Sequence, residues 1–206
     1  MRAYVTEFIG TFFLVFTIGM SVVGNVPMAA VAIGSILMVM VFMGGHISGA
    51  HYNPAVTLAV FLRGKLPAKD LLPYWISQLI AACAAGGVVW AILHKGLPSG
   101  QIPKEMILSA LLNEFIYTFA LALVVLNVAT AKGTEGNSFY GLAIGFTVTA
   151  AALAGGGVSG GAYNPAVGLG LTVMGASLAN IWIWIVGPLA GGALAAFVFK
   201  FQHPGE

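Results

Sequence analysis

Long apolar stretches, separated by short polar connections, dominate the chain. Six of these stretches approach the roughly 20 residues that an α-helix needs to cross a bilayer. They cover residues 4–23, 28–44, 71–93, 105–129, 139–153 and 178–201. The second and the fifth are short, and a segment rich in glycine and serine follows each of them. The pattern predicts an all-α membrane protein with six transmembrane helices and no appended soluble domain.

Two shorter apolar segments, 56–62 and 167–173, have about half the length of a spanning helix. Each follows the same tetrapeptide, Asn-Pro-Ala-Val. Asparagine is a good N-cap, and proline suits the first helical turn, where its missing N–H is not needed. Irregular backbone at membrane depth is tolerated only where it is buried in protein or lines water. We therefore expect two re-entrant half-helices, which begin at Asn53-Pro54 and Asn164-Pro165.

The two halves of the chain, about residues 1–100 and 101–206, repeat the same order of elements. The segment TEFIGTFFL from Thr6 recurs as NEFIYTFAL, and HISGAHYNPAV recurs as GVSGGAYNPAV from Gly157. Each half contributes three full spans, an odd number, so the second copy enters the membrane from the opposite side. We expect a single transmembrane domain over residues 1–206, built from inverted repeats whose Asn-Pro turns meet near the midplane.

Composition supports a membrane location and excludes several functions. Hydrophobic residues make up 59% of the chain and charged residues 7%, whereas about a quarter of a soluble domain is charged. The net charge of +2 is too small to indicate binding to nucleic acid. His46 and His51, with no Cys, Asp or Glu beside them, make a poor metal site. No nucleophile–base pair is evident, so we expect neither an enzyme nor a cofactor.

The distribution of Lys and Arg predicts the orientation. With the N-terminus in the cytoplasm, six basic residues face inward and only Lys95 and Lys104 face outward. The inward set consists of Arg2, Arg63, Lys65, Lys69, Lys132 and Lys200. Both termini should therefore be cytoplasmic. The short loops are typical of a prokaryotic protein, which would lie in the plasma (inner) membrane.

Two acidic residues, Glu7 and Glu114, stand at matching positions in the first helix of each repeat. Ionisable side chains inside a membrane are expensive and need partners. The pairs Ser48-Gly49 and Ser159-Gly160 predict extended loops before the two motifs, with carbonyl groups along a path. We expect the two carboxylates to accept hydrogen bonds from backbone N–H groups of these loops. Proton coupling is the functional alternative.

The facing half-helices predict a polar, uncharged constriction. Each helix N-terminus carries roughly half a positive charge, and each asparagine NH₂ group can donate into the gap. Such a site binds water or hydroxyl groups and repels cations, protons included. The predicted constriction consists of Asn53, Pro54, Ala55, Asn164, Pro165 and Ala166.

These features resemble the aquaporin and glycerol-facilitator (major intrinsic protein) family over essentially the whole chain. The resemblance rests on the paired Asn-Pro-Ala triplets, the stretch SGAHYNPAVT, the glutamate at the head of each repeat and the six spans in inverted halves. It implies an aquaporin-like homotetramer in the lipid bilayer, with one pore per subunit. It also places His46 near the cytoplasmic half of the pore, either as a pH-dependent gate or as a lining or packing residue.

One position departs from the family pattern. In most members the second motif ends in an arginine that belongs to a narrow outer filter, and Val167 stands there in this chain. Counted from the motifs, the other filter positions are Ile33, Ala152 and Gly161. Water-selective members usually carry an aromatic residue near the first of these and a histidine near the second. The chain is therefore an atypical member, for which we expect a wide apolar filter.

The resulting hypothesis is a passive channel for water and small uncharged solutes of broad range. The expected solutes are glycerol, urea, ammonia, hydrogen peroxide and undissociated metalloid acids. A strict water channel with an unusual filter is the main alternative. A coupled secondary transporter is a further one, and it would need carboxylates near the midplane.

Overall fold

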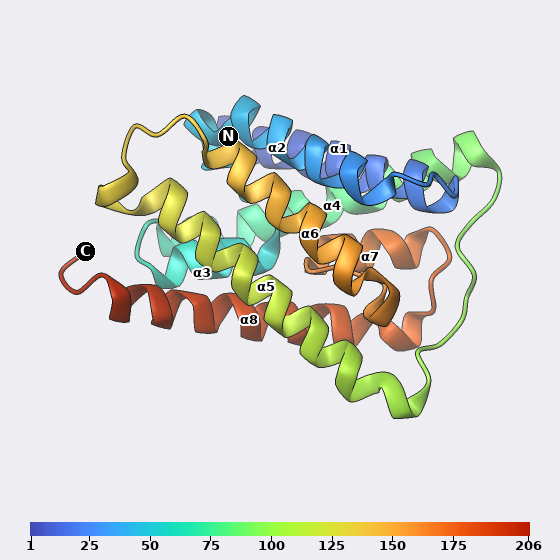
Figure 1. Ribbon diagram of the computed structural model, residues 1–206. Helices are drawn as coiled ribbons and strands as arrows, with labels where there is room; N and C mark the ends of the chain where they lie inside the picture. The colour runs from blue at the N-terminus through green and yellow to red at the C-terminus, as the bar shows by residue number, and fades with distance from the viewer.

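The computed structural model describes residues 1–206 and contains helices but no strand (Figure 1). Six helices are long and apolar enough to cross a membrane, as the sequence predicts. They are α1 (Arg2–Val23), α2 (Ala29–Ser48), α4 (Ala68–Leu93), α5 (Ile107–Thr130), α6 (Tyr140–Ser159) and α8 (Ile181–Gln202). The two half-helices are α3 (Pro54–Leu62) and α7 (Pro165–Val173). Three short 3-10 turns are η1 (Lys104–Met106), η2 (Lys132–Thr134) and η3 (Leu178–Asn180).

The C-terminal ends of α2 and α6 differ from the prediction. These helices continue through Ser48 and Ser159, whereas the sequence pattern ended them at residues 44 and 153 and made the Ser-Gly pairs extended loops. Each helix stops at the following glycine, Gly49 (φ 85°) or Gly160 (φ 88°), in a left-handed conformation that glycine adopts easily. The irregular segments begin only at Gly49 and Gly160, later than predicted, because the glycines before Ser48 and Ser159 continue the helices and do not end them.

Glycines allow close packing where α2 and α6 cross. A Cβ atom on Gly34 would lie 2.6 Å from the carbonyl oxygen of Gly145, and one on Gly145 would lie 2.5 Å from the carbonyl oxygen of Gly34. The two backbones therefore touch directly, which only residues without a side chain permit. This contact holds the second helix of one repeat against the second helix of the other.

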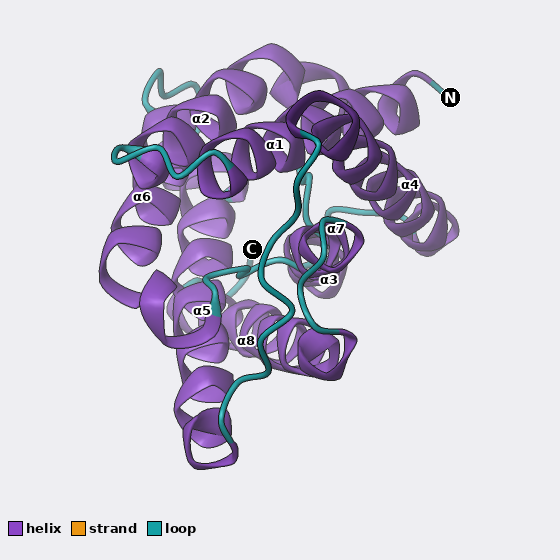
Figure 2. Cartoon of the chain, turned by 90° about the vertical axis from the view of Figure 1, so that its right-hand side faces the viewer, coloured by secondary structure: helices purple, strands orange, loops and turns teal.

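The six long helices surround the two half-helices (Figures 1 and 2). In Figure 2, which looks along the bundle, α3 and α7 lie one behind the other inside the ring of long helices. In Figure 1 they come from opposite ends of the bundle and meet near its middle. The half-helices are therefore arranged end to end, with their N-termini together.

Both termini lie at the same end of the bundle. The side chain of Glu206 accepts a hydrogen bond from the guanidinium of Arg63, just after α3, at 3.1 Å. It also accepts from the backbone N–H of Lys132, in the α5–α6 connection, at 3.2 Å. The Tyr4 hydroxyl near the start of α1 donates to Asp70 at 2.7 Å. At the end of the bundle that carries most of the basic residues, hydrogen bonds therefore link the C-terminus to the segment after α3 and to the α5–α6 connection, and link α1 to α4.

Candidate functional site

Each Asn-Pro pair begins a half-helix. The Asn53 side-chain oxygen accepts a hydrogen bond from the backbone N–H of Ala55 at 2.8 Å. The Asn164 oxygen accepts from the N–H of Ala166 at 2.9 Å. Because an N-cap satisfies N–H groups that have no partner within the helix, both short helices can begin in the interior of the bundle.

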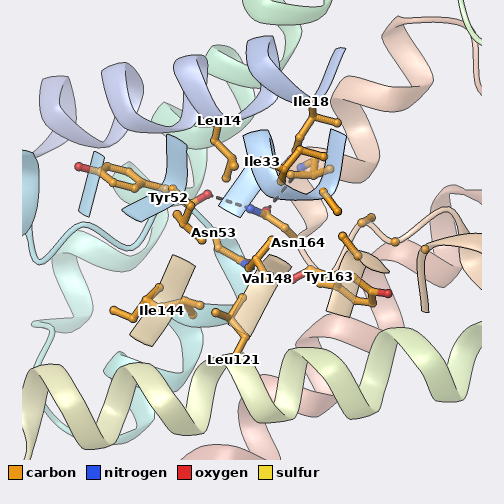
Figure 3. Close-up of a pocket in the computed structure, with 18 of the residues that line it drawn as sticks. Leu14, Ile18, Ile33, Tyr52, Asn53, Leu121, Ile144, Val148, Tyr163 and Asn164 are labelled. Carbon is orange, nitrogen blue, oxygen red and sulfur yellow. Dashed lines mark hydrogen bonds between the residues drawn. The ribbon is translucent and has the colours of Figure 1, made fainter. Parts of the chain in front are cut away.

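The two motifs are also bonded to each other. The Asn53 Nδ2 atom donates to the carbonyl oxygen of Tyr163 at 2.9 Å, and the Asn164 Nδ2 atom donates to the carbonyl oxygen of Tyr52 at 2.9 Å (Figure 3). These reciprocal bonds join the repeats across more than 100 residues of sequence. Each NH₂ group has two hydrogens, so one remains for a molecule in the centre of the bundle.

The chain makes a turn before each half-helix, the first turn at residues 49–53 and the second at residues 160–164, and the tyrosines before the asparagines shape these two turns. Tyr52 and Tyr163 both have a φ of 50°, a conformation that costs a non-glycine residue about 1 kcal/mol or more. Their buried rings point away from the central cavity in opposite directions (Figure 3). The hydroxyls donate to the carbonyls of Met40 at 2.9 Å and Ala151 at 3.0 Å. The side chains therefore anchor the strained turns, and they leave the cavity to the backbone.

Glu7 holds the first turn in place through its carboxylate, which accepts four hydrogen bonds. One of its oxygens accepts from the Ser48 hydroxyl at 2.7 Å and from the backbone N–H of His51 at 2.9 Å. The other accepts from the N–H of Tyr52 at 2.7 Å and from Gln78 Nε2 at 2.8 Å. The side chain is fully buried, and four donors compensate for its lost hydration.

Glu114 holds the second turn in the same way. It accepts from the Ser159 hydroxyl at 2.6 Å and from the backbone N–H groups of Ala162 at 2.9 Å and Tyr163 at 2.5 Å. It too is fully buried. Neither glutamate belongs to the wall of the central cavity or of the vestibule described below. The arrangement thus gives both carboxylates partners in the loops rather than access to a moving ion.

A central cavity of about 240 Å³ passes between the half-helices and the surrounding long helices (Figure 3). Asn53 and Asn164 both contribute to its wall. The four predicted filter positions do so too: Ile33, Ala152, Gly161 and Val167. The rest of the wall is mainly aliphatic and includes Leu14, Ile18, Leu121, Ile144 and Val148. No side chain at a filter position can donate a hydrogen bond.

A second cavity, here called the vestibule, opens at the end that carries the termini. Its volume is about 750 Å³, and its wall includes charged side chains, Lys65, Asp70 and Lys132 among them. The exposed His46 also lies in this wall, so a gating role for it stays a prediction. The vestibule and the central cavity share His51, Val125 and Ile144. The two cavities therefore adjoin at these residues.

Several supporting residues were missed from the sequence. His51 was considered only as a metal ligand, but it is buried where the two cavities adjoin. Gln78 donates to the carboxylate of Glu7 and to the hydroxyl of Thr57, and Asn113 donates to the hydroxyl of Tyr163. A polar residue within an apolar helix is itself a signal, because its side chain needs a partner in the membrane. That signal was present for both of them.

Comparison with known proteins agrees with this arrangement. The family model of the major intrinsic proteins matches residues 1–199. Aquaporin NIP1-1 of Oryza sativa subsp. japonica is 38% identical over 97% of this chain and 74% of its own length. Nodulin-26 of Glycine max is 35% identical over 97% of this chain and 77% of its own length. These relatives are plant proteins and give no support to the prokaryotic source expected from the short loops.

The fold also matches a solved structure. The X-ray structure of the aquaglyceroporin from Plasmodium falciparum superimposes with a TM-score of 0.83. The match covers 98% of this chain and 97% of the other chain, at 22% sequence identity. At this identity the likeness concerns the fold, including six long helices and two half-helices, as the sequence predicts.

Proposed function

This chain belongs to the major intrinsic protein family and is an integral, multi-pass membrane channel for water and small solutes, and we propose that it has a broad specificity for uncharged solutes. The proposed solutes are water, glycerol, urea, ammonia, hydrogen peroxide and undissociated metalloid acids. They pass through a wide apolar filter formed by Ile33, Ala152, Gly161 and Val167.

One observation carries the proposal: all four filter positions lie in the wall of the central cavity, and none offers a side-chain donor. An arginine at position 167 would fill part of this space and would bring a fixed positive charge. Valine at 167 and glycine at 161 leave the space apolar and open. Bulkier neutral solutes therefore meet neither a charge nor a large side chain at this level.

The central asparagines favour neutral polar solutes over ions. Asn53 and Asn164 each keep one N–H for a solute, and the positive ends of α3 and α7 face the same space. A neutral hydroxyl or water accepts these bonds without a charge penalty, while a cation is repelled by both helix ends. With no arginine in the filter, cation exclusion in the proposed channel depends on this central pair.

The proposal includes a homotetramer with both termini in the cytoplasm. The orientation is supported by the six basic residues predicted to face inward, against two predicted to face outward. Many large apolar side chains are exposed on the outer surface of the bundle, including Phe13 on α1 and Phe146 on α6. Such a surface suits contact with lipid and with neighbouring subunits. Placement in a prokaryotic inner membrane is supported only by the short loops.

The test compares native protein with Val167→Arg in proteoliposomes, by stopped-flow light scattering with glycerol and with water. We expect native vesicles to pass glycerol, and Val167→Arg to lower glycerol permeability by about tenfold, a discrimination that one side chain in a pocket can provide. Water permeability should change less. Val167→Met, which adds length without a donor, is the matched control and should have the smaller effect on the ratio of glycerol to water.

Two results would contradict the proposal. Native vesicles that conduct water but not glycerol, with little change in Val167→Arg, would indicate a water channel whose constriction lies elsewhere. Saturable uptake driven by an ion gradient would indicate a coupled transporter. The second result would be hard to reconcile with the structure, because Glu7 and Glu114 lie outside both cavities.

A further inference from the structure

The central cavity and the vestibule adjoin at three residues: His51 from the first turn, Val125 from α5 and Ile144 from α6. All three are buried, with exposed fractions of 6%, 5% and 4%. We propose that this group, the neck, selects solutes in place of the apolar outer filter, and that His51 is its hydrogen-bond acceptor. The inference rests on the proposed channel function and assigns a specificity-determining residue within it.

The His51 ring is held in one orientation. Its Nδ1 atom lies 3.2 Å from the Thr57 hydroxyl oxygen, which also accepts from Gln78 Nε2 at 2.9 Å. The ring lies 5.1 Å, centroid to centroid, from that of Tyr74. Its backbone N–H is bound to Glu7. The imidazole is therefore fixed on one edge, and only its other edge is available to the neck.

The hydrogen bonds of Thr57 determine which ring nitrogen carries the proton. A threonine hydroxyl has one hydrogen to donate, and here the carbonyl oxygen of Asn53 lies at 2.9 Å, closer than His51 Nδ1 at 3.2 Å. The hydroxyl thus donates to Asn53 and accepts from Nδ1–H. In the neutral ring Nε2 is then an acceptor. The Nε2 atom of His51 makes no hydrogen bond within the chain. Four side-chain polar atoms are fully buried without a partner, and Nε2 is not one of them, so it is accessible from the cavity.

No other side chain in the central cavity offers a free acceptor. The oxygens of Asn53 and Asn164 cap their half-helices, and the tyrosine hydroxyls lie away from the cavity. In the second turn, the position that corresponds to His51 is Ala162. A solute with an O–H or N–H group therefore finds donors at the centre and a side-chain acceptor only at the neck. The substrate class is that of neutral hydrogen-bond donors.

Two substitutions separate this role from a structural one. His51→Asn keeps a polar group near the Nδ1 position, within reach of Thr57, but has nothing at the Nε2 position. His51→Gln reaches the Nε2 position with an amide. His94→Asn is the matched control, because His94 is exposed, lies outside both cavities and has a φ of 50° that asparagine tolerates.

Glycerol and water permeabilities of the four proteins are measured in proteoliposomes, at equal amounts of protein that elutes as one species from size exclusion. We expect His51→Asn to lower glycerol permeability about fivefold, the effect of one lost hydrogen bond, and His51→Gln to recover most of it. His94→Asn should match the native protein. The proposal that the neck selects solutes is overturned if His51→Asn leaves glycerol permeability unchanged. It is also overturned if glycerol permeability is as low in His51→Gln as in His51→Asn.

The same vesicles distinguish this inference from the proposed function. If native protein passes no glycerol, broad specificity fails. The neck is then judged on water, which also donates O–H groups: His51→Asn should lower water permeability and His51→Gln should recover it. If glycerol passes in all four proteins at equal rates, the proposed function stands and the neck is wrong.

Discussion

The two turns that meet at the centre share a frame but differ in the groups they offer to a solute. In each, a buried glutamate binds two backbone N–H groups, a tyrosine has a φ of 50° and an asparagine caps a half-helix. A long helix also donates to the last carbonyl before the turn, from Tyr74 to Ser48 and from Trp184 to Ser159, both at 2.8 Å. The backbone of both turns is therefore held by the same contacts.

The differences concern polar side chains. The first turn has His51 in the wall of both cavities, and Thr57 in α3 is fully buried and lies within hydrogen-bond distance of its ring. The corresponding positions of the second half are Ala162 and Gly168. Gln78 lies four residues after Tyr74, while a proline lies four residues after Trp184. The comparison shows that the frame needs few side chains, so one half of the pore can be polar and the other apolar without a change in backbone. The apolar half contains Val167.

Removal of the glutamates should give the largest effect. Glu7→Leu leaves four donors without their acceptor and Glu114→Leu leaves three, and each unsatisfied buried group costs about 1–3 kcal/mol. We expect both variants to be strongly destabilised, Glu7→Leu more so. The measurement is the thermal unfolding midpoint in detergent, with the exposed Glu105→Leu as the control. Equal midpoints for Glu7→Leu and the control would contradict the shared frame.

An intermediate effect is expected at the constriction. Asn53→Asp and Asn164→Asp keep the cap oxygen, but each replaces the NH₂ group with a negative charge that faces the cavity. A carboxylate attracts cations, so we expect both variants to raise cation current at least about tenfold over the native channel. Voltage-clamped oocytes provide the measurement, and the exposed Asn25→Asp is the control. A rise in only one of the two variants would show that the asparagines are not equivalent.

The smallest effect should come from the tyrosine hydroxyls. Tyr52→Phe removes one hydrogen bond, to the carbonyl of Met40. Tyr163→Phe removes two, one to the carbonyl of Ala151 and one from Asn113 at 3.2 Å. At about 1 kcal/mol for each bond, Tyr163→Phe should lower the unfolding midpoint further than Tyr52→Phe. Thermal unfolding of the two purified variants in one detergent decides this, and the reverse order would refute it.

Much of the fold could be predicted from the sequence. The six apolar stretches gave the long helices, and the two Asn-Pro pairs gave the start of each half-helix. The ends of α2 and α6 could not be predicted, because glycine and serine continue a helix in one context and end it in another. At Ser48 the helix continues because its hydroxyl has a buried acceptor in Glu7, 41 residues away in the sequence.

The features that the sequence determined by itself depend on residues that are close together along the chain. Apolar length, N-capping and proline at the first turn act within a few positions, so they identify the spans and the half-helices directly. The tertiary structure alone decided that Asn53 reaches the carbonyl of Tyr163, 110 residues away. It also decided that His51 adjoins Val125 and Ile144. Such contacts depend on how three separate elements pack, and no local pattern contains that information.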